Sequence, residues 1–375
     1  MLTEVLGILQ WAGDQKAALD QIESAYSAVL ARRLGAKLGN LKTANPELAD
    51  QILALLSETD TATLRRVVLA PETCSRVMWD NAGRCDHRDL YQYLIDVLNV
   101  ERSGLKRSPK RRSSTGPARW SALGDRCVND KGIVVVLQPA RAGLTVDSES
   151  PAAVCFDYSA MGKGGMQLQH YHEPTTKELA LSRLEAAMRT LDEVDPPVAE
   201  FVRHFTLVAT VVTTDESSFS SGSTIQYVGR SMFCNAHLTA IDSAVLAEAL
   251  VHEAIHSLLY MHELCEPWVR YEGLQDAIPI ESPWTGSRLA LRAFLHACFV
   301  WFGLVNFWTR AQRASIFPPR RIEEHLVMAR RGFLKGPLTS RLLEHSPRMV
   351  PQVLELVGTM QENVLSGATG VYARK

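Results

Sequence analysis

The stretch VHEAIH, residues 251–256, is the part of the sequence around which the rest can be arranged. Asp242 or Ser243 can cap a helix that starts just before it, the residues from 244 on are good helix formers, and no glycine or proline follows before Pro267. On a helix, His252 and His256 lie on one face, about 6 Å apart along the axis. Both rings can then share one metal ion, with Glu253 beside the open coordination position. The alternative is a buried helix whose histidines form hydrogen bonds inside the core.

The composition is that of an ordinary soluble globular protein. The chain has 375 residues, of which 46% are hydrophobic and 22% charged, with a formal net charge of −1. This length can bury a substantial core and predicts more than one region. The near-zero net charge gives no global attraction to nucleic acid or to an anionic membrane. Seven scattered cysteines without CxxC spacing favour a reducing cytoplasm over a disulfide framework or a zinc ribbon.

Two further features predict a cytoplasmic protein without membrane contact. Asp14, Lys16 and Asp20 come too early for the apolar core of a signal peptide. The most apolar run, residues 293–308, contains His296 and is too short to cross a bilayer. We therefore expect this run to form a buried helix.

The sequence pattern divides the chain into three regions. Residues 1–101 show apolar positions at helical spacing, and we expect an N-terminal helical region. Residues 102–120 combine proline, glycine and serine with seven basic side chains and predict a basic flexible loop or linker. Because no aromatic residues are interleaved with its charges, nucleic acid is not a favoured partner for this loop. Residues 121–375 are expected to form an α+β metal-binding catalytic region that ends in helices.

Several short runs rich in β-branched residues predict a modest sheet. The predicted fold is α+β, mostly helical, with a small central β-sheet packed near the HExxH metal-binding helix. Residues 224–228 and 232–236 are expected to be strands around a short turn, and residues 177–194 are expected to be a helix. The remaining predicted strands are residues 133–137, 152–156 and 205–212.

A metal ion needs a third ligand from a later segment. His262 points to another face of the predicted helix, and Glu263, seven residues beyond the motif's second histidine, lies roughly 10 Å along the axis. The candidates are Glu272, Glu281 and His296. His296 sits in an otherwise apolar helical segment, where it is either a hydrogen-bonded core residue or a ligand that faces the HExxH helix.

Two arginines share a side of the helix with His296. Arg288 and Arg292 precede it by eight and four residues. Cations in apolar surroundings require carboxylate partners, so ion pairs with the glutamates between residues 263 and 272 are one interpretation. The other is a clamp for an anionic cosubstrate beside the metal.

Three segments carry a family resemblance: LVHEAIHSLLY at 250–260, SPWTG at 282–286 and FLHACFVW at 294–301. They resemble the HExxH-type 2-oxoglutarate-dependent peptide β-hydroxylases, which are associated with bacterial ribosomally made, post-translationally modified peptides. The likeness covers residues 225–310.

This resemblance implies a mononuclear Fe(II) centre held by His252, His256 and His296, with 2-oxoglutarate and O₂ as cosubstrates. Arg292 or Arg288 would bind the far carboxylate of 2-oxoglutarate. Glu253 would act beside the metal or position the substrate. The implied reaction hydroxylates a side-chain β-carbon of a precursor peptide.

Two other functions fit the same residues. A zinc metallopeptidase would use His252, His256 and either Glu281 or Glu272 as Zn²⁺ ligands, with Glu253 as the general base. A catalytically silent peptide-binding protein would use the basic loop and a sheet edge. The sequence carries no signal for an oligomeric state.

Overall fold

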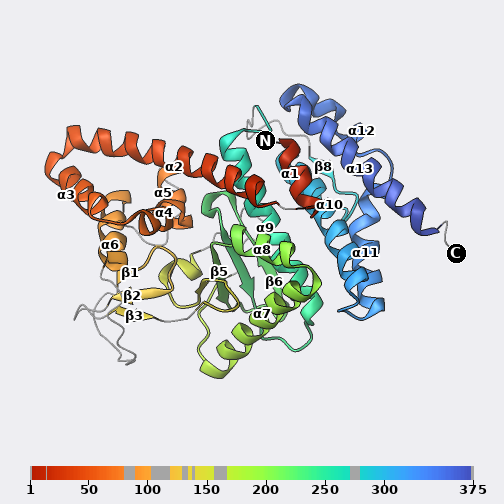
Figure 1. The fold of residues 1–375 in the computed structure, drawn as a ribbon, viewed down its shortest axis with the longest axis horizontal. Helices are drawn as coiled ribbons and strands as arrows, with labels where there is room; N and C mark the ends of the chain where they lie inside the picture. Colours follow the sequence, from red (N-terminus) through yellow and green to blue (C-terminus); the bar gives the residue numbers. More distant parts are fainter. Residues whose placement is uncertain are drawn as a thin grey trace. The chain divides into compact units, whose positions relative to one another are not determined.

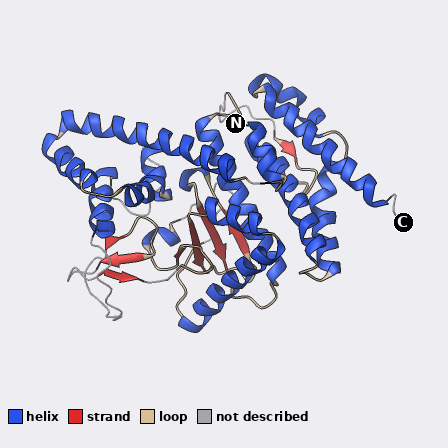
Figure 2. Cartoon of the chain, in the orientation of Figure 1, coloured by secondary structure: helices blue, strands red, loops and turns tan. Residues whose placement is uncertain are grey.

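The chain folds into helices with small sheets (Figures 1 and 2). A computed structural model describes residues 2–13, 15–79, 89–102, 119–128, 134–136, 140–155, 167–270 and 279–372. The predicted α+β, mostly helical fold class is confirmed. Two compact units gather segments that are distant in sequence. The first consists of Met1–Glu23, Met188–Val202 and Ala247–Lys375, and the second of Ser24–Ala187 and Arg203–Leu246.

The first unit is built around helix α10, Leu291–Ala314, which packs against α1, α11 and α13 (Figure 1). It contains the predicted buried helix at residues 293–308, and most of its apolar side chains are buried. A two-stranded antiparallel hairpin, β8 Ile280–Glu281 and β9 Arg288–Leu289, precedes it. The other helices are α1 Leu2–Leu9, α11 Pro319–Leu334, α12 Leu338–Leu342 and α13 Pro351–Tyr372, with a 3₁₀ helix at Leu343–Arg348.

Helix α9, Ser243–Cys265, carries the HExxH motif. It begins in the second unit, where the side chain of Asp242 accepts a hydrogen bond from the amide of Val245 at 3.0 Å, so the predicted cap is confirmed. It enters the first unit at Ala247. There it runs antiparallel to α10, because successive contacts along α9 meet α10 in reverse order. These contacts are Glu248 with Trp308, His252 with Trp301, His256 with His296, and Glu263 with Arg292.

The second unit contains a four-stranded sheet in the order β4-β5-β7-β6. The first three strands are parallel, and β6 pairs antiparallel with β7. A second, antiparallel sheet has the order β1-β2-β3. The strands are β1 Arg119–Trp120, β2 Arg126–Val128, β3 Val134–Val136, β4 Val146–Asp147, β5 Val208–Val212, β6 Ser220–Gly222 and β7 Arg230–Cys234.

Helices account for most of the remaining chain. The predicted helix at residues 177–194 is confirmed within α7, Pro174–Val194, and the first hundred residues are helical wherever they are described, apart from short connections. The helices are α2 Lys16–Ala44, α3 Pro46–Ser57, α4 Thr61–Leu69, α5 Pro71–Met78, α6 Leu90–Arg102 and α8 Pro196–Phe205.

Two predicted strands are wrong. Residues 152–156 begin in a 3₁₀ helix, Pro151–Val154, because proline at the first position favours a helical turn. Residues 224–228 contain another 3₁₀ helix, Ile225–Tyr227, within the connection between β6 and β7. Gly229, at φ +87°, then turns the chain into β7, and a Cβ there would lie 2.6 Å from the side chain of Leu207.

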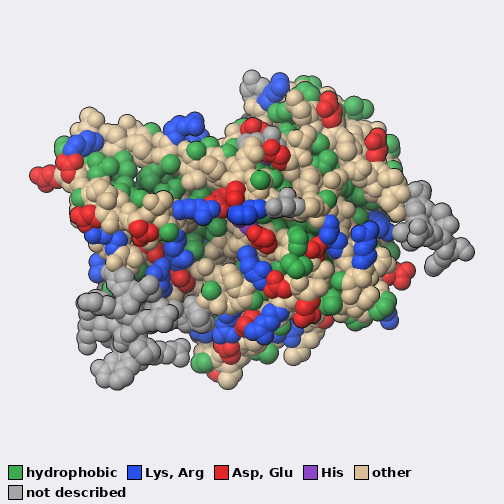
Figure 3. Space-filling model, viewed as in Figure 1, with side chains coloured by type: hydrophobic (Ala, Val, Ile, Leu, Met, Phe, Trp, Pro, Cys, Tyr) green, Lys and Arg blue, Asp and Glu red, His purple; other side chains and the backbone are tan. Residues whose placement is uncertain are grey.

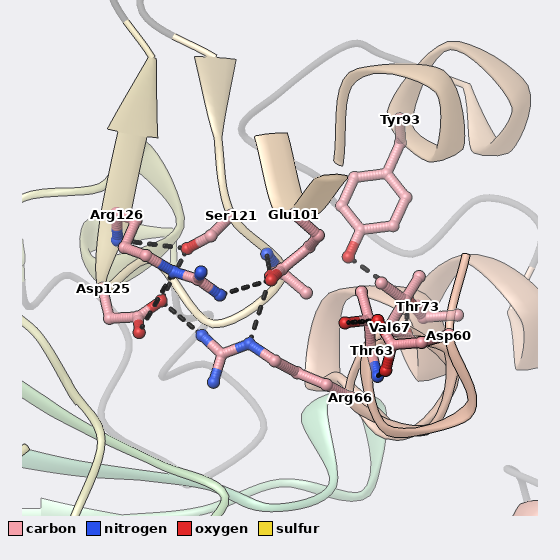
Figure 4. Close-up of polar contacts among 11 residues, drawn as sticks. Asp60, Thr63, Arg66, Val67, Thr73, Tyr93, Glu101, Ser121, Asp125 and Arg126 are labelled. Carbon is pink, nitrogen blue, oxygen red and sulfur yellow. Dashed lines mark hydrogen bonds and ion pairs between the residues drawn. The ribbon is translucent and has the colours of Figure 1, made fainter. Parts of the chain in front are cut away.

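An ion-pair network links α4, α6 and the β1–β2 hairpin (Figure 4). The buried carboxylate of Glu101 accepts a hydrogen bond from Arg66 Nε at 3.1 Å and another from the amide of Ala122 at 3.0 Å. Arg126 also donates to Glu101, and Asp125 pairs with Arg66. The network borders a cleft of about 570 Å³. Because these two arginines are already paired with carboxylates, the network is explained as a cross-link that holds the hairpin against the helices.

The surface carries both basic and acidic side chains (Figure 3), as the nearly equal numbers of the two kinds in the sequence predict. On the face drawn in Figure 3, basic and acidic side chains are interspersed. The predicted basic loop at 102–120 lies mostly outside the described residues, which resume at Arg119. The surface that is drawn agrees with the near-zero net charge.

Helices α9 and α10 are long and apolar enough to cross a membrane by length and composition alone. In each, 72% of the most apolar window is buried inside the structure. Core helices of soluble proteins have the same character. The burial therefore agrees with a soluble protein.

Candidate metal centre

Helix α9 presents His252 and His256 one turn apart. Their ring centroids lie 5.0 Å from each other, and both side chains are half-buried. Glu253, between them in sequence, is only 3% exposed. The helical spacing thus gives the two imidazoles a common accessible side and gives the carboxylate much less access to solvent.

Helix α10 brings His296 to the second of these histidines. Nδ1 of His296 lies 3.3 Å from Nδ1 of His256, and the two rings are stacked with centroids 5.5 Å apart. Two nitrogens that each bind one metal ion at about 2.1 Å lie about 3.0–3.4 Å apart for angles between octahedral and tetrahedral. The observed separation fits two adjacent ligands of a single ion, and it equally fits an N–H···N hydrogen bond between the two rings.

The carboxylate of Glu263 faces the other ring nitrogen of His296, Nε2. Its Oε2 lies 3.2 Å from His296 Nε2 and 3.2 Å from Arg292 Nε. A carboxylate in this position accepts the Nε2–H of a neutral imidazole, which leaves the Nδ1 lone pair free for a metal. Glu263 was expected to lie too far along the axis to be a ligand, and its contact with His296 was not predicted. Its place one turn before the end of a helix that faces α10 is the signal that could have identified it.

Burial and neighbouring charge favour the neutral form of His256 and His262. Burial lowers the pKa of His256 well below its usual value, and the nearby His252 and His296 add to the shift. Burial also lowers the pKa of His262 to about 4. Neutral imidazole is the form that binds a metal, so no proton has to be displaced from His256 near neutral pH.

Aromatic side chains surround the three histidines. Tyr260 stacks on His256 with centroids 5.8 Å apart, and its ring lies 5.0 Å from that of His296. Burial raises the pKa of the Tyr260 hydroxyl, and the charges of Glu253 and Glu263 raise it further, so this hydroxyl stays protonated. The indole of Trp268 lies 5.6 Å from His296. Neither Tyr260 nor Trp268 was predicted to be part of the site.

The other predicted site residues are placed differently. Arg292 forms an ion pair with Glu263, which was one of the two interpretations of this arginine; the other was a clamp for an anionic cosubstrate. A third of its side chain stays exposed. Arg288 is exposed on β9, opposite Glu281 on β8. Glu281 is exposed as well, and Glu272 lies outside the described residues.

The residues fit a metal at two of the three implied positions. Within the described parts of the chain, no group of three or more His, Cys, Asp or Glu side chains is arranged to hold a metal ion. His256 and His296 meet at ligand distance, and His252 lies beside His256. Glu263 Oε1 is buried and makes no hydrogen bond within the described residues, so the carboxylate keeps an unused acceptor.

Comparisons with known proteins identify no family for this chain. A scan against models of protein families finds no match. A search of curated proteins finds no matching sequence. The functional assignment therefore depends on the residues of the site and on the resemblance of its motifs.

Proposed function

We propose that this protein is a cytoplasmic, non-haem Fe(II)- and 2-oxoglutarate-dependent oxygenase that hydroxylates a side-chain carbon of a ribosomally made peptide. The observation that carries the proposal is the 3.3 Å approach of His256 Nδ1 to His296 Nδ1, with Glu263 on the far nitrogen of His296. Histidines that bind metals usually donate their second N–H to such an acceptor. The HExxH and FLHACFVW motifs supply His256 and His296 in the family that the chain resembles.

The proposed iron ligands are His252, His256 and His296. Bound Fe(II) with 2-oxoglutarate and O₂ would supply an oxidant that removes hydrogen from an unactivated carbon, leaving succinate and CO₂. The proposal requires the ring of His252 to turn about its side-chain bonds so that one nitrogen faces those of the other two. In the present structure the His252 ring lies 5.0 Å from that of His256 and 6.5 Å from that of Trp301.

The remaining side chains would position the reactants. Arg292 lies beside Glu263 with a third of its side chain exposed, so its guanidinium can hold the ion pair and also meet the far carboxylate of 2-oxoglutarate. Arg288 is the second candidate for that contact. The burial of Glu253 favours a positioning role over that of a base that activates bulk water.

The test is succinate release from 2-oxoglutarate in air by anaerobically purified, Fe(II)-loaded protein. We expect Fe(II)-dependent succinate formation by the wild type and its loss in His252→Ala, His256→Ala and His296→Ala. His172→Ala removes an exposed histidine of the second unit and serves as the matched control. Retention of full activity in His296→Ala would refute the ligand assignment.

The same preparation separates the alternatives. Stoichiometric zinc with peptide cleavage that needs no 2-oxoglutarate, and is lost in Glu253→Gln, would support the metallopeptidase. An iron- and zinc-free protein that binds peptide without turnover would support a binding protein. Either result would refute the oxygenase.

A further inference from the structure

The α9–α10 pair leaves a narrow accessible strip beside the histidines. His252, His256 and Tyr260 of α9 are half-buried, as are Ala297 and Trp301 of α10. The residues that flank them on both helices are fully buried, among them Ile255, Leu259, Cys298 and Val300. Ala297 has the smallest side chain of the five half-buried residues. A substrate that reaches His252 and His256 must lie along this strip.

Trp301 stands at one end of the strip, in ring contact with Trp284 and His252. Its ring stacks on that of Trp284 at 6.0 Å with an interplanar angle of 11°, and it meets the ring of His252 at 6.5 Å and 88°. Trp284 is fully buried, and its Nε1 donates to the carbonyl of Ala329 at 2.9 Å. A Cβ at Gly332 would lie 2.1 Å from the Trp284 ring, so that ring packs directly against the backbone of α11. Trp301 is thus a preorganised aromatic surface.

The two ends of the strip differ in chemistry. Arg292, partly exposed, lies at the Tyr260 and Glu263 end and suits an anion. The Trp301 end offers a large apolar ring held on a buried support, which suits an apolar or aromatic side chain. The difference gives a bound peptide a defined direction along α10.

We propose that Trp301, with Ala297 beside it, forms a subsite that takes an apolar or aromatic side chain of the peptide next to the carbon that reacts. The inference rests on the proposed function for the identity of the substrate as a peptide. It goes further in naming the class of side chain recognised and the residues that recognise it.

The test uses ¹⁹F spectra of the full chain labelled with 5-fluorotryptophan, with the Trp301 signal assigned from Trp301→Phe. The probes are N-acetyl-phenylalanine amide and N-acetyl-serine amide at millimolar concentrations. We expect the Trp301 signal to shift with the phenylalanine probe and not with the serine probe. The signal of Trp308, fully buried on the same helix, should stay in place. No shift at Trp301, or equal shifts with both probes, would overturn the proposal.

Two variants give an independent readout. Ala297→Phe fills the strip without removing the indole, and Trp301→Leu keeps an apolar side chain but removes the ring. We expect each to weaken binding of the phenylalanine probe about fivefold to twentyfold in ligand-observed spectra. Unchanged affinity in both would refute the subsite. Binding of the probe requires no turnover. A failed succinate assay together with a shifted Trp301 signal would therefore refute the oxygenase proposal and support the subsite.

Discussion

Replacing Glu263 by glutamine tests whether the carboxylate orients His296. The substitution keeps the volume of the side chain and removes the charge that faces His296 Nε2 and Arg292 Nε, both at 3.2 Å. Loss of such an outer acceptor typically weakens metal binding 10–100-fold, which is about 1.4–2.7 kcal/mol. Arg292 would also lose its ion pair with Glu263. Because its side chain is 33% exposed, we expect a loss of only about 1–2 kcal/mol in the free energy of unfolding.

The assay is anaerobic competition for Fe(II) against a calibrated chelator, with thermal unfolding measured on the same samples. Glu266→Gln is the matched control, because it removes the same charge three residues later from a side chain that is 51% exposed. We expect the control to bind Fe(II) as the wild type does. If Glu263→Gln and Glu266→Gln had the same affinity as the wild type, the carboxylate would have no part in orienting the ligand, and the reasoning would be refuted.

Three further predictions concern stability. The pKa of His262 is about 4 in the fold against about 6.5 when unfolded. Its contribution to the free energy of unfolding is therefore complete above pH 6.5 and is lost as the pH falls toward 4. His262→Gln should remove about 3 kcal/mol of this acid dependence in denaturant titrations. Gly332→Ala should cost about 1–3 kcal/mol, because its Cβ would press on the ring of Trp284, and thermal unfolding measures the loss. Asp147→Asn should cost about 1–3 kcal/mol in chemical denaturation, because it removes the charge of one of the two carboxylates that pair with the buried Arg230, at 3.1 Å, and leaves Glu72 at 3.3 Å.

Each of these predictions has a control. His172→Gln changes an exposed histidine and should keep the acid dependence of the wild type. Gly39→Ala adds a Cβ with no atom within 4 Å on an exposed face of α2 and should stabilise the helix by up to about 1 kcal/mol. Asp20→Asn breaks an exposed pair with Lys16 and should cost less than about 1 kcal/mol. A substitution that behaves like its control would contradict the corresponding explanation.

The helical part of the fold could be predicted because its signals are local. Apolar spacing predicted the helical region of residues 1–101 and the helix at 177–194, and the Asp242 cap predicted the start of the helix that carries the HExxH motif. The runs at 152–156 and 224–228 failed because β-branched composition alone does not separate a strand from a short 3₁₀ turn. The β6 strand, Ser220–Gly222, has too polar a composition to be recognised, and its pairing with β7 is set by tertiary contacts.

Helix periodicity could predict only those residues of the candidate site that lie on one helix. His252 and His256 follow from their spacing of four residues, and His296 was selected by resemblance and by its position in an apolar helix. The role of Glu263 depends on the antiparallel register of α9 and α10, which no local pattern specifies. The same register brings Trp301 to His252. Side chains that act across two helices therefore required the structure.

The most direct test of the central claim is X-ray absorption at the iron edge of anaerobic, Fe(II)-loaded protein, with and without the His296→Ala substitution. We predict three imidazole rings around iron in the wild type and two in the variant. An iron environment made only of oxygen ligands, or one that His296→Ala leaves unchanged, would contradict the claim that the HExxH helix and α10 together hold the metal.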